Sequence, residues 1–226
     1  MKLGIHQSQY IPWPPYFKKI ALSDKFVILD HVQFQKNGVQ NRNKLRNKNG
    51  DFWLTIPVKS SLEESINCKE VADHKWKRKH FQSISQSYSK SPFWKELKDD
   101  IEQIYSLESI KLNDINIAFI KFILEKLEID TEIIISSNEG FLGKKSELVL
   151  NICSKLNATT YLSGLGSKDY LDLDSFTDKH ISIDFIESSL ASYPQIHGDF
   201  IPGLSIIDMM MNISCEDIKN YLYDKN

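Results

Sequence analysis

The sequence predicts an α/β protein with a mostly parallel, Rossmann-like sheet and a helical insertion at about residues 74–128. Two observations lead to this class. Short, unbroken apolar runs alternate with longer segments whose apolar residues recur at helical spacing, as in βαβ units. Unbroken apolar runs also suit strands that are covered on both faces. We find no repeat, low-complexity tract or clear linker, so we expect a single domain over residues 1–226.

The first thirty residues form the first predicted unit of strand, helix and strand. Residues 2–5 are a short apolar run. Pro14 and Pro15 can open a helix, because proline is tolerated in the first turn, and apolar residues follow at helical spacing over 16–22. Residues 25–30 are a continuous apolar strand that ends in a carboxylate. Two strands joined by a helix predict a parallel pair.

The middle of the chain predicts a hairpin region followed by helices. Residues 35–50 contain five Lys or Arg, no acid and many Asn, which is typical of a loop or a ragged hairpin. The apolar run at 52–58 predicts a strand closed by a proline. Helices are expected at 74–89, at 92–106 after a serine cap, and at 112–127. These three helices are the expected insertion.

The second half of the chain returns to alternating strands and helices. Its strands are short apolar or alternating runs, and its helices carry apolar residues at helical spacing. The expected elements are strands at 131–136, 159–163 and 180–186 and helices at 144–157, 167–171, 205–212 and 216–223.

The composition is ordinary for a globular protein, with 41% hydrophobic and 26% charged residues. The formal charge of −2 gives no reason to expect nucleic acid as a partner. Three cysteines without C-x-x-C spacing argue against a disulfide framework, and no ligand-spaced cluster argues for a metal. We therefore expect a cytoplasmic protein without metal. No apolar run resembles a signal peptide or approaches the ~18 residues of a membrane span.

Polar and aromatic side chains follow the first expected strand directly. Ligands of open parallel sheets bind beyond the carboxyl ends of the strands, so His6 would point into that crevice. A histidine there can serve as a general base. We take Gln7, Tyr10 and Trp13 as substrate-binding residues, since aromatic rings can stack on a base or line a sugar pocket. The alternative is structural: a histidine that holds the loop and aromatics that plug the sheet.

Two basic stretches offer contacts for phosphates. Residues 36–48 and 75–79 are rich in Lys and Arg, and most lysines in such runs are solvated. Arg42, beside Asn41, and Arg78 are the strongest candidates for substrate binding, because Arg presents a bidentate fork. A basic surface of this kind would also attract an acidic carrier protein.

Two further stretches follow later strands. Ser163 and Gly164 end one strand, and glycine allows a ligand to come close, so both are candidate substrate-binding residues. Backbone N–H groups at the expected helix start could hold an anion; the alternative is a tight turn.

The second of these stretches is YPQIHGDF at 193–200. We expect Tyr193 and Gln195 to contact substrate, and His197 is the second candidate for the catalytic base. If this segment packs beside the first loop, His197 shares one pocket with His6.

Several motifs together resemble those of the WbqC-like family of bacterial proteins, over residues 3–212. They are IHQSQYIPWPPYFKKI with SDKFVILDHVQF, QNRN at 40–43, WKRKH at 76–80, YLSG at 161–164 and YPQIHGDF at 193–200. The chain departs from the family at Pro14 and Pro15, where an apolar residue and glycine are usual, and at Ser8, where proline is usual. His6, Gln7, Tyr10 and Trp13 stay in place.

The resemblance implies a role in the biosynthesis of O-antigens and other surface polysaccharides. It implies a transferase that attaches an acyl or aminoacyl group to the amino group of a nucleotide-linked dideoxy amino sugar. We expect no bound cofactor; a carrier protein with a phosphopantetheine thioester would supply the acyl group. The alternative is a non-catalytic module that binds a nucleotide sugar or a carrier protein.

Overall fold

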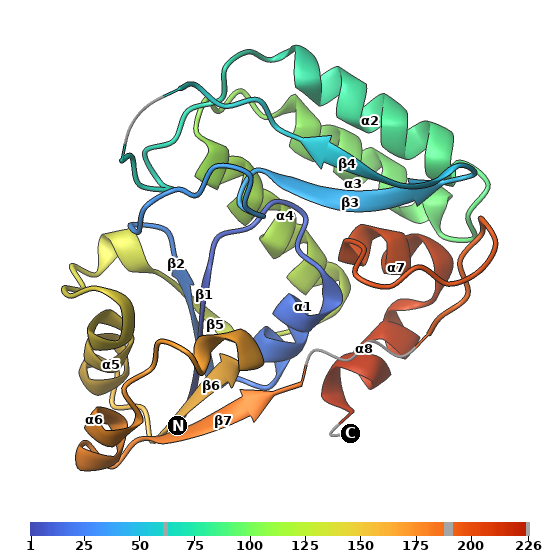
Figure 1. The fold of residues 1–226 in the computed structure, drawn as a ribbon. Coiled ribbons are helices and arrows are strands. Elements are labelled where there is room, and N and C mark those ends of the chain that lie inside the picture. Colours follow the sequence, from blue (N-terminus) through green and yellow to red (C-terminus); the bar gives the residue numbers. More distant parts are fainter. Residues whose placement is uncertain (61–62, 188–191, 225–226) are drawn as a thin grey trace.

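A computed structural model describes residues 1–60, 63–187 and 192–224 of the protein. Five strands form one sheet in the order β5-β2-β1-β6-β7, and each neighbouring pair is parallel (Figure 1). These strands are β1 Lys2–Gln7, β2 Lys25–Leu29, β5 Glu132–Ile135, β6 Thr160–Gly164 and β7 Ser182–Ile186. The predicted α/β fold with a parallel, Rossmann-like sheet is confirmed.

The strand order reverses at the centre of the sheet. From β1 the chain moves outward to β2 and β5, and then crosses to β6 and β7 on the other side of β1. Gly4 of β1 is opposite Phe26 of β2 on one side and opposite Leu162 of β6 on the other. The carboxyl ends of β1 and β6 therefore lie at a topological switch point, the usual ligand position in such sheets.

The sheet is covered on both faces because successive side chains of its strands point to opposite sides. In β2, Phe26 and Ile28 join one buried core, and Val27 joins the other. The first core includes α1 (Pro14–Ala21), and the second includes α5 (Lys145–Lys155) and α6 (Leu173–Asp178). Figure 1 shows α5 and α6 together at the end of the molecule away from α7 and α8.

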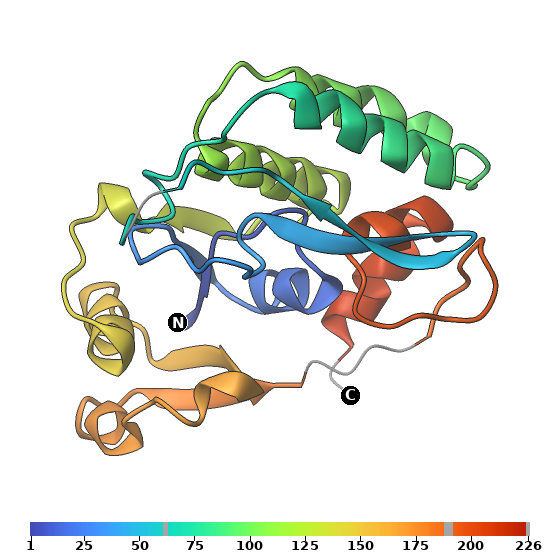
Figure 2. The ribbon, with the colours of Figure 1, turned by 45° about the horizontal axis from the view of Figure 1, so that its top comes forward.

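The predicted insertion between β2 and β5 is larger than its three helices. A regular antiparallel hairpin precedes them, formed by β3 (Arg42–Asn47) and β4 (Gly50–Thr55). The helices are α2 Lys75–Tyr88, α3 Trp94–Ser106 and α4 Leu112–Lys126, and the C-terminal helices are α7 Ile206–Asn212 and α8 Cys215–Tyr223. The hairpin contacts α2 and α7, and α8 contacts α1 (Figure 2). Residues of the insertion and of the C-terminal helices share the first buried core.

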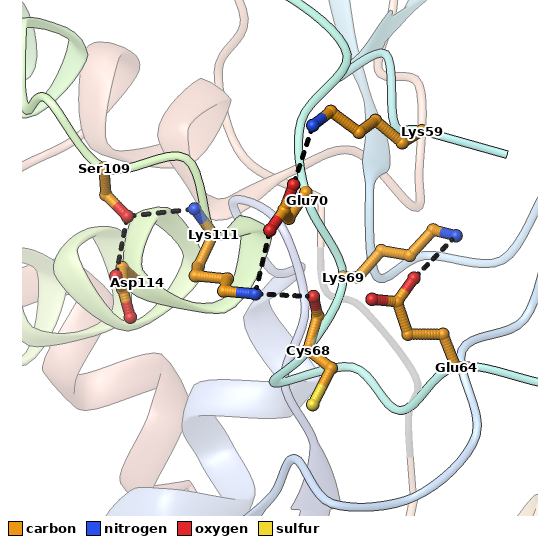
Figure 3. A network of polar contacts seen from close by, with 8 residues as sticks. All are labelled: Lys59, Glu64, Cys68, Lys69, Glu70, Ser109, Lys111 and Asp114. Carbon is orange, nitrogen blue, oxygen red and sulfur yellow. Dashed lines mark hydrogen bonds and ion pairs between the residues drawn. The ribbon is translucent and has the colours of Figure 1, made fainter. Parts of the chain in front are cut away.

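A network of polar contacts joins the connection after β4 to the start of α4 (Figure 3). Lys111 Nζ donates to Glu70 Oε1 at 3.2 Å and to the carbonyl of Cys68 at 3.0 Å. Lys59 Nζ pairs with Glu70 Oε2 at 2.8 Å. Cys68 contributes its carbonyl, and its sulfur takes no part in the bonds drawn. These contacts hold an irregular segment against the helices.

The predicted helix at 167–171 is wrong. Residues Leu165–Ser167 form a single 3₁₀ turn, and the α-helix begins later, after Asp172 accepts a hydrogen bond from the backbone of Ser175. The Ser167 hydroxyl donates to the carbonyl of Gly164 at 2.8 Å. Such a local bond competes with helical bonding. The segment after β6 is therefore a tight turn, which was the alternative interpretation, and the expected helix N-terminus for an anion is absent there.

Candidate functional site

A cleft of about 530 Å³ opens at the switch point of the sheet. Its described walls come from β1, α1, the turn after β6 and the end of β7; we call it the sheet cleft. The predicted residues that it brings together are His6, Gln7, Trp13, Ser163 and Gly164.

His6 is the next-to-last residue of β1 and is partly buried in the sheet cleft. Its ring meets the edge of the Tyr16 ring, with the centroids 5.1 Å apart. Burial, and then the positive charge of Lys19, lower the pKa of His6 from 6.5 to about 3. The imidazole is therefore neutral at physiological pH, which is the form that can accept a proton.

The hydrogen bonds of His6 involve its Nδ1 atom. The carbonyl of Gln7 is 3.3 Å away and Nε2 of Gln9 is 3.2 Å away, and these two bonds need opposite tautomers. The buried Oε1 of Gln9 has no partner among the described residues, so rotation of that amide would let it accept from Nδ1–H. No hydrogen bond from a described residue reaches the Nε2 of His6. With a proton on Nδ1, the Nε2 lone pair is free for a substrate.

Lys19 of α1 is a cleft residue that the sequence analysis missed. The residue is 7% exposed, and its Nζ donates to the carbonyl of Ile5 at 3.5 Å. Burial lowers the pKa of Lys19 from 10.5 to about 8. One signal was available: Lys19 follows Tyr16 by three positions, so helical spacing places both on one face of α1.

The opposite wall of the sheet cleft follows β6. Ser163 is fully buried, and its Oγ lies 2.5 Å from the Oγ of Ser167. Gly164 faces Lys19: a Cβ on Gly164 would lie 4.0 Å from Lys19 Nζ. The absence of a side chain there leaves space above the ammonium group.

Tyr10, a predicted substrate-binding residue, lies away from the sheet cleft. It is fully buried, and its hydroxyl lies 2.8 Å from His80 Nδ1 and 2.5 Å from the Tyr105 hydroxyl. The backbone at Ile11 has a φ of 37°, which is strained for a β-branched residue, and Asn43 Nδ2 donates to the Ile11 carbonyl at 2.8 Å. Tyr10 thus fixes the first loop to the helical insertion.

The remaining residues predicted from the basic stretches are also outside the described lining of the sheet cleft. Asn41 is buried and donates to the carbonyl of Ile56 at 2.8 Å. Arg42 lies over the exposed ring of Trp53, 4.4 Å from its centroid. Arg78 is exposed on α2.

His197 lies in a different cavity, of about 730 Å³, between the β3–β4 hairpin and the end of α2. The expectation that His6 and His197 share one pocket is wrong. Residues 195–199 lie at the hairpin, where Arg46 donates to the carbonyls of His197 and Asp199 and to Oε1 of Gln195. The imidazole Nε2 of His197 is 2.7 Å from the carbonyl of Ser87.

A buried carboxylate completes this second region. Asp208 of α7 accepts the hydroxyl of Tyr88 at 2.6 Å and that of Tyr193 at 2.7 Å. Burial is the largest effect on the pKa of Asp208 and raises it. We call Arg46, Tyr88, Tyr193, Gln195 and Asp208 the Arg46 cluster. Tyr193 and Gln195, predicted to contact substrate, hold the 193–201 segment in place.

A third polar cluster at the same edge of the sheet resembles a catalytic triad but has different geometry. Ser136 Oγ lies 2.7 Å from Nδ1 of His31 and donates to Asp30 Oδ1 at 2.9 Å. Ser136 is 1% exposed, and Asp30 also accepts from Ser137 and Asn113. A nucleophile needs access and a base aligned by the carboxylate, so this cluster is structural.

Comparison with known proteins identifies the family. A family model described as the WbqC-like protein family matches residues 7–220. The chain belongs to this family. This WbqC-like chain is also similar to "Uncharacterized protein Rv1507c" of Mycobacterium tuberculosis (strain ATCC 25618 / H37Rv), with 31% identity over 219 residues, 95% of each chain. No solved structure matches it. The resemblance seen in the sequence is confirmed.

Two structural findings bear on the class of this WbqC-like protein. Among the described residues, no helix combines the length and apolar character needed to cross a membrane. In the same part of the chain, no three or more His, Cys, Asp or Glu side chains gather as metal ligands would.

Proposed function

We propose that the protein is a transferase of O-antigen or other surface-polysaccharide biosynthesis. It attaches an acyl or aminoacyl group to the amino group of a nucleotide-linked dideoxy amino sugar in the sheet cleft. The observation that carries the proposal is a neutral His6 in the lining of the cleft, at the switch point of the sheet, whose Nε2 takes no hydrogen bond from a described residue. The family membership agrees with it.

The proposed reaction needs a proton acceptor more than a strong base. The neutral amine of the sugar attacks the thioester carbonyl, a C–N bond forms, and the C–S bond breaks. The attacking nitrogen becomes acidic as the bond forms, so it loses its proton to His6 Nε2. The leaving thiolate then takes up a proton, and the products are an amide and a free thiol.

The donor in this proposal is a thioester on an acidic carrier protein. The β3–β4 hairpin offers a matching surface, where Arg42 lies over the exposed ring of Trp53, 4.4 Å from its centroid, beside Lys44, which is paired with Asp51 at 2.6 Å. Cations beside an aromatic ring suit an acidic partner that carries an extended apolar arm.

One observation favours a second candidate function, a binding module that delivers a nucleotide sugar without turnover. A pKa of about 3 makes His6 a weak base in the free protein. A binding module needs no base at all.

An amide-formation assay separates the two functions. The protein is mixed with nucleotide-linked amino sugars and acyl or aminoacyl thioesters, and the amide is detected by its mass. We expect product with the native protein and loss of product in His6→Asn, which keeps a polar group near the position of Nδ1. The matched control is His180→Asn, because His180 is exposed and its φ of 57° suits asparagine.

Product in the native protein and the control, but not in His6→Asn, supports the transferase. Tight nucleotide-sugar binding by calorimetry, with no amide from any donor, contradicts it and leaves the binding module.

A further inference from the structure

Lys19 is a buried cation that has no counter-ion among the described residues. Buried charges in proteins are normally paired, because removing an ion from water is costly. No described carboxylate forms an ion pair with Lys19, and its single hydrogen bond, to the Ile5 carbonyl, is long at 3.5 Å. The residues outside the described ranges include no Asp or Glu. Within the described part of the chain, the positive charge of Lys19 is therefore uncompensated in the sheet cleft.

The surroundings of Lys19 contain few groups that could titrate with it. The titratable side chains that line the sheet cleft are His6, Tyr16, Lys19, Tyr161, Tyr170 and Glu187. Glu187 is exposed, just beyond the end of β7, and burial alone accounts for the lowered pKa of Lys19. Gly164 leaves the space opposite Nζ open. A ligand can fill that space.

We infer that Lys19 binds an oxyanion, and that the sheet cleft takes a ligand with phosphate groups, one of which lies beside Lys19 Nζ and the turn at Gly164. This inference rests on the proposed function and deepens it, since the diphosphate of a nucleotide-linked sugar supplies such an anion. It replaces the phosphate contacts first expected at Arg42 and Arg78 with a residue inside the cleft.

The chemistry of amide formation argues against Lys19 as a covalent relay. An acyl group on Nζ would be an amide, as stable as the proposed product, and it would not move on to a second amine. A charge role needs no such step. At neutral pH Lys19, with a pKa of about 8, is mainly protonated and can pair with an anion.

Oxyanion binding would also act on His6. The charge of Lys19 is the second largest cause of the low pKa of His6. A phosphate beside Lys19 offsets that charge, so it raises the pKa of His6 and makes it a better proton acceptor. Binding of the phosphate would thus raise the basicity of His6, the residue that accepts the proton of the same ligand.

Calorimetry with inorganic pyrophosphate, UDP and uridine tests the inference. We expect pyrophosphate and UDP to bind and uridine to bind much more weakly. Lys19→Met should weaken pyrophosphate binding roughly tenfold or more, as expected for loss of a charge-assisted contact. Gly164→Val should also weaken it by filling the space, and the glycine backbone has an ordinary β conformation that tolerates valine.

The matched control is Lys18→Met. Lys18 is the preceding residue of α1 and is equally buried at 7% exposure, but it is not among the described lining residues of the cleft. We expect the pyrophosphate affinity of Lys18→Met to stay within about twofold of the native value, because Lys18 is outside the described lining of the cleft. Thermal unfolding of each variant establishes that it is folded.

Proton uptake provides a second readout. Pairing with an anion raises the pKa of Lys19, so binding at pH 8 takes up protons, measured in two buffers of different ionisation enthalpy. This uptake should be present in Lys18→Met and reduced in Lys19→Met. Equal affinity and equal proton uptake in the native protein and Lys19→Met would overturn the inference, as would absence of pyrophosphate binding.

These outcomes are distinct from those of the amide assay. Lys19-dependent binding without any amide product keeps the inference and overturns the transferase. Amide formation by Lys19→Met at native KM keeps the transferase and overturns the inference.

Discussion

The sheet cleft and the Arg46 cluster are both buried polar regions, but they differ in how many partners their charged groups have. In the Arg46 cluster, Arg46 donates to three acceptors and Asp208 accepts two tyrosine hydroxyls. In the sheet cleft, Lys19 has one long bond to a carbonyl and His6 leaves one ring nitrogen without a bond from a described residue. His6, one of the two histidines that the sequence singled out, lies in the sheet cleft, and the carbonyl of the other, His197, accepts from Arg46.

The contrast separates structure from binding. Polar groups that satisfy one another hold a segment in place and have little left to offer a ligand. Polar groups left without partners lower stability, and a ligand that pairs with them recovers that loss. The four predictions below test this difference, ordered by the expected size of the effect.

The largest effect should come from Arg46→Met. The substitution removes the donor to the carbonyls of His197 and Asp199, and it leaves the Gln195 amide oxygen with the backbone N–H of Ile201 alone. We expect the free energy of unfolding to fall by about 3 kcal/mol or more, measured by urea denaturation. Lys48→Met, an exposed change on the same hairpin, is the control. A loss below about 1 kcal/mol would mean that the cluster does not hold the segment.

Lys19→Met should instead raise the free energy of unfolding. The folded-state pKa of Lys19, about 8, lies below its ordinary value of 10.5, so its charge destabilises the fold at and below pH 8. We expect the variant to be more stable than the native protein at pH 7, by up to about 3 kcal/mol. The difference should shrink as pH rises from 8 to 10.5, which urea denaturation across that range would measure. A destabilised Lys19→Met would contradict an unpaired ammonium.

His6 should make the protein sensitive to acid. Its pKa is 6.5 when unfolded and about 3 when folded, so the unfolded state alone binds a proton between these values, and stability falls as pH drops through that window. At pH 5 we expect His6→Asn to lose about 2 kcal/mol less stability, relative to pH 7, than the native protein. The pKa of His80 is lowered to about 4, so His80 also makes the fold less stable in acid, and this contribution remains in the variant. If the free energy of unfolding fell equally with pH in His6→Asn and in the native protein, His6 would not be desolvated.

The smallest effect should come from Arg78→Gln. Arg78 is exposed and lies outside the described lining of both cavities. We expect the free energy of unfolding to change by less than about 0.5 kcal/mol and pyrophosphate affinity by less than about twofold. Isothermal calorimetry and urea denaturation would measure both. A tenfold loss of affinity would place the phosphates on α2 rather than in the sheet cleft.

The sequence predicted the part of the site that follows from strand ends. His6 and Gln7 follow one apolar run and Ser163 and Gly164 follow another, and the carboxyl ends of parallel strands meet at one edge. It did not predict Lys19, because two adjacent lysines suggest a solvated surface and only the packing of α1 on the sheet buries them.

Long-range packing explains the other differences. Tyr10 became a core residue because His80 and Tyr105, distant in sequence, cover it. His197 lies away from the sheet cleft because Arg46 of the hairpin donates to its carbonyl. Neither partner is encoded in the local pattern of apolar and polar residues.

The reversal of strand order at the centre of the sheet has a kinetic consequence. β1 meets β2 within the first thirty residues, but its other neighbour, β6, is far along the chain: the amino group of Met1 donates to Thr159, 158 positions away. The entropic cost of closing a loop rises by only about 0.6 kcal/mol for each doubling of the loop length. Pairings between distant parts of the chain nevertheless slow folding. The two walls of the sheet cleft therefore come together only when β6 docks. During synthesis, His6 and Lys19 are made early, and they can face Gly164 only after most of the chain has been made.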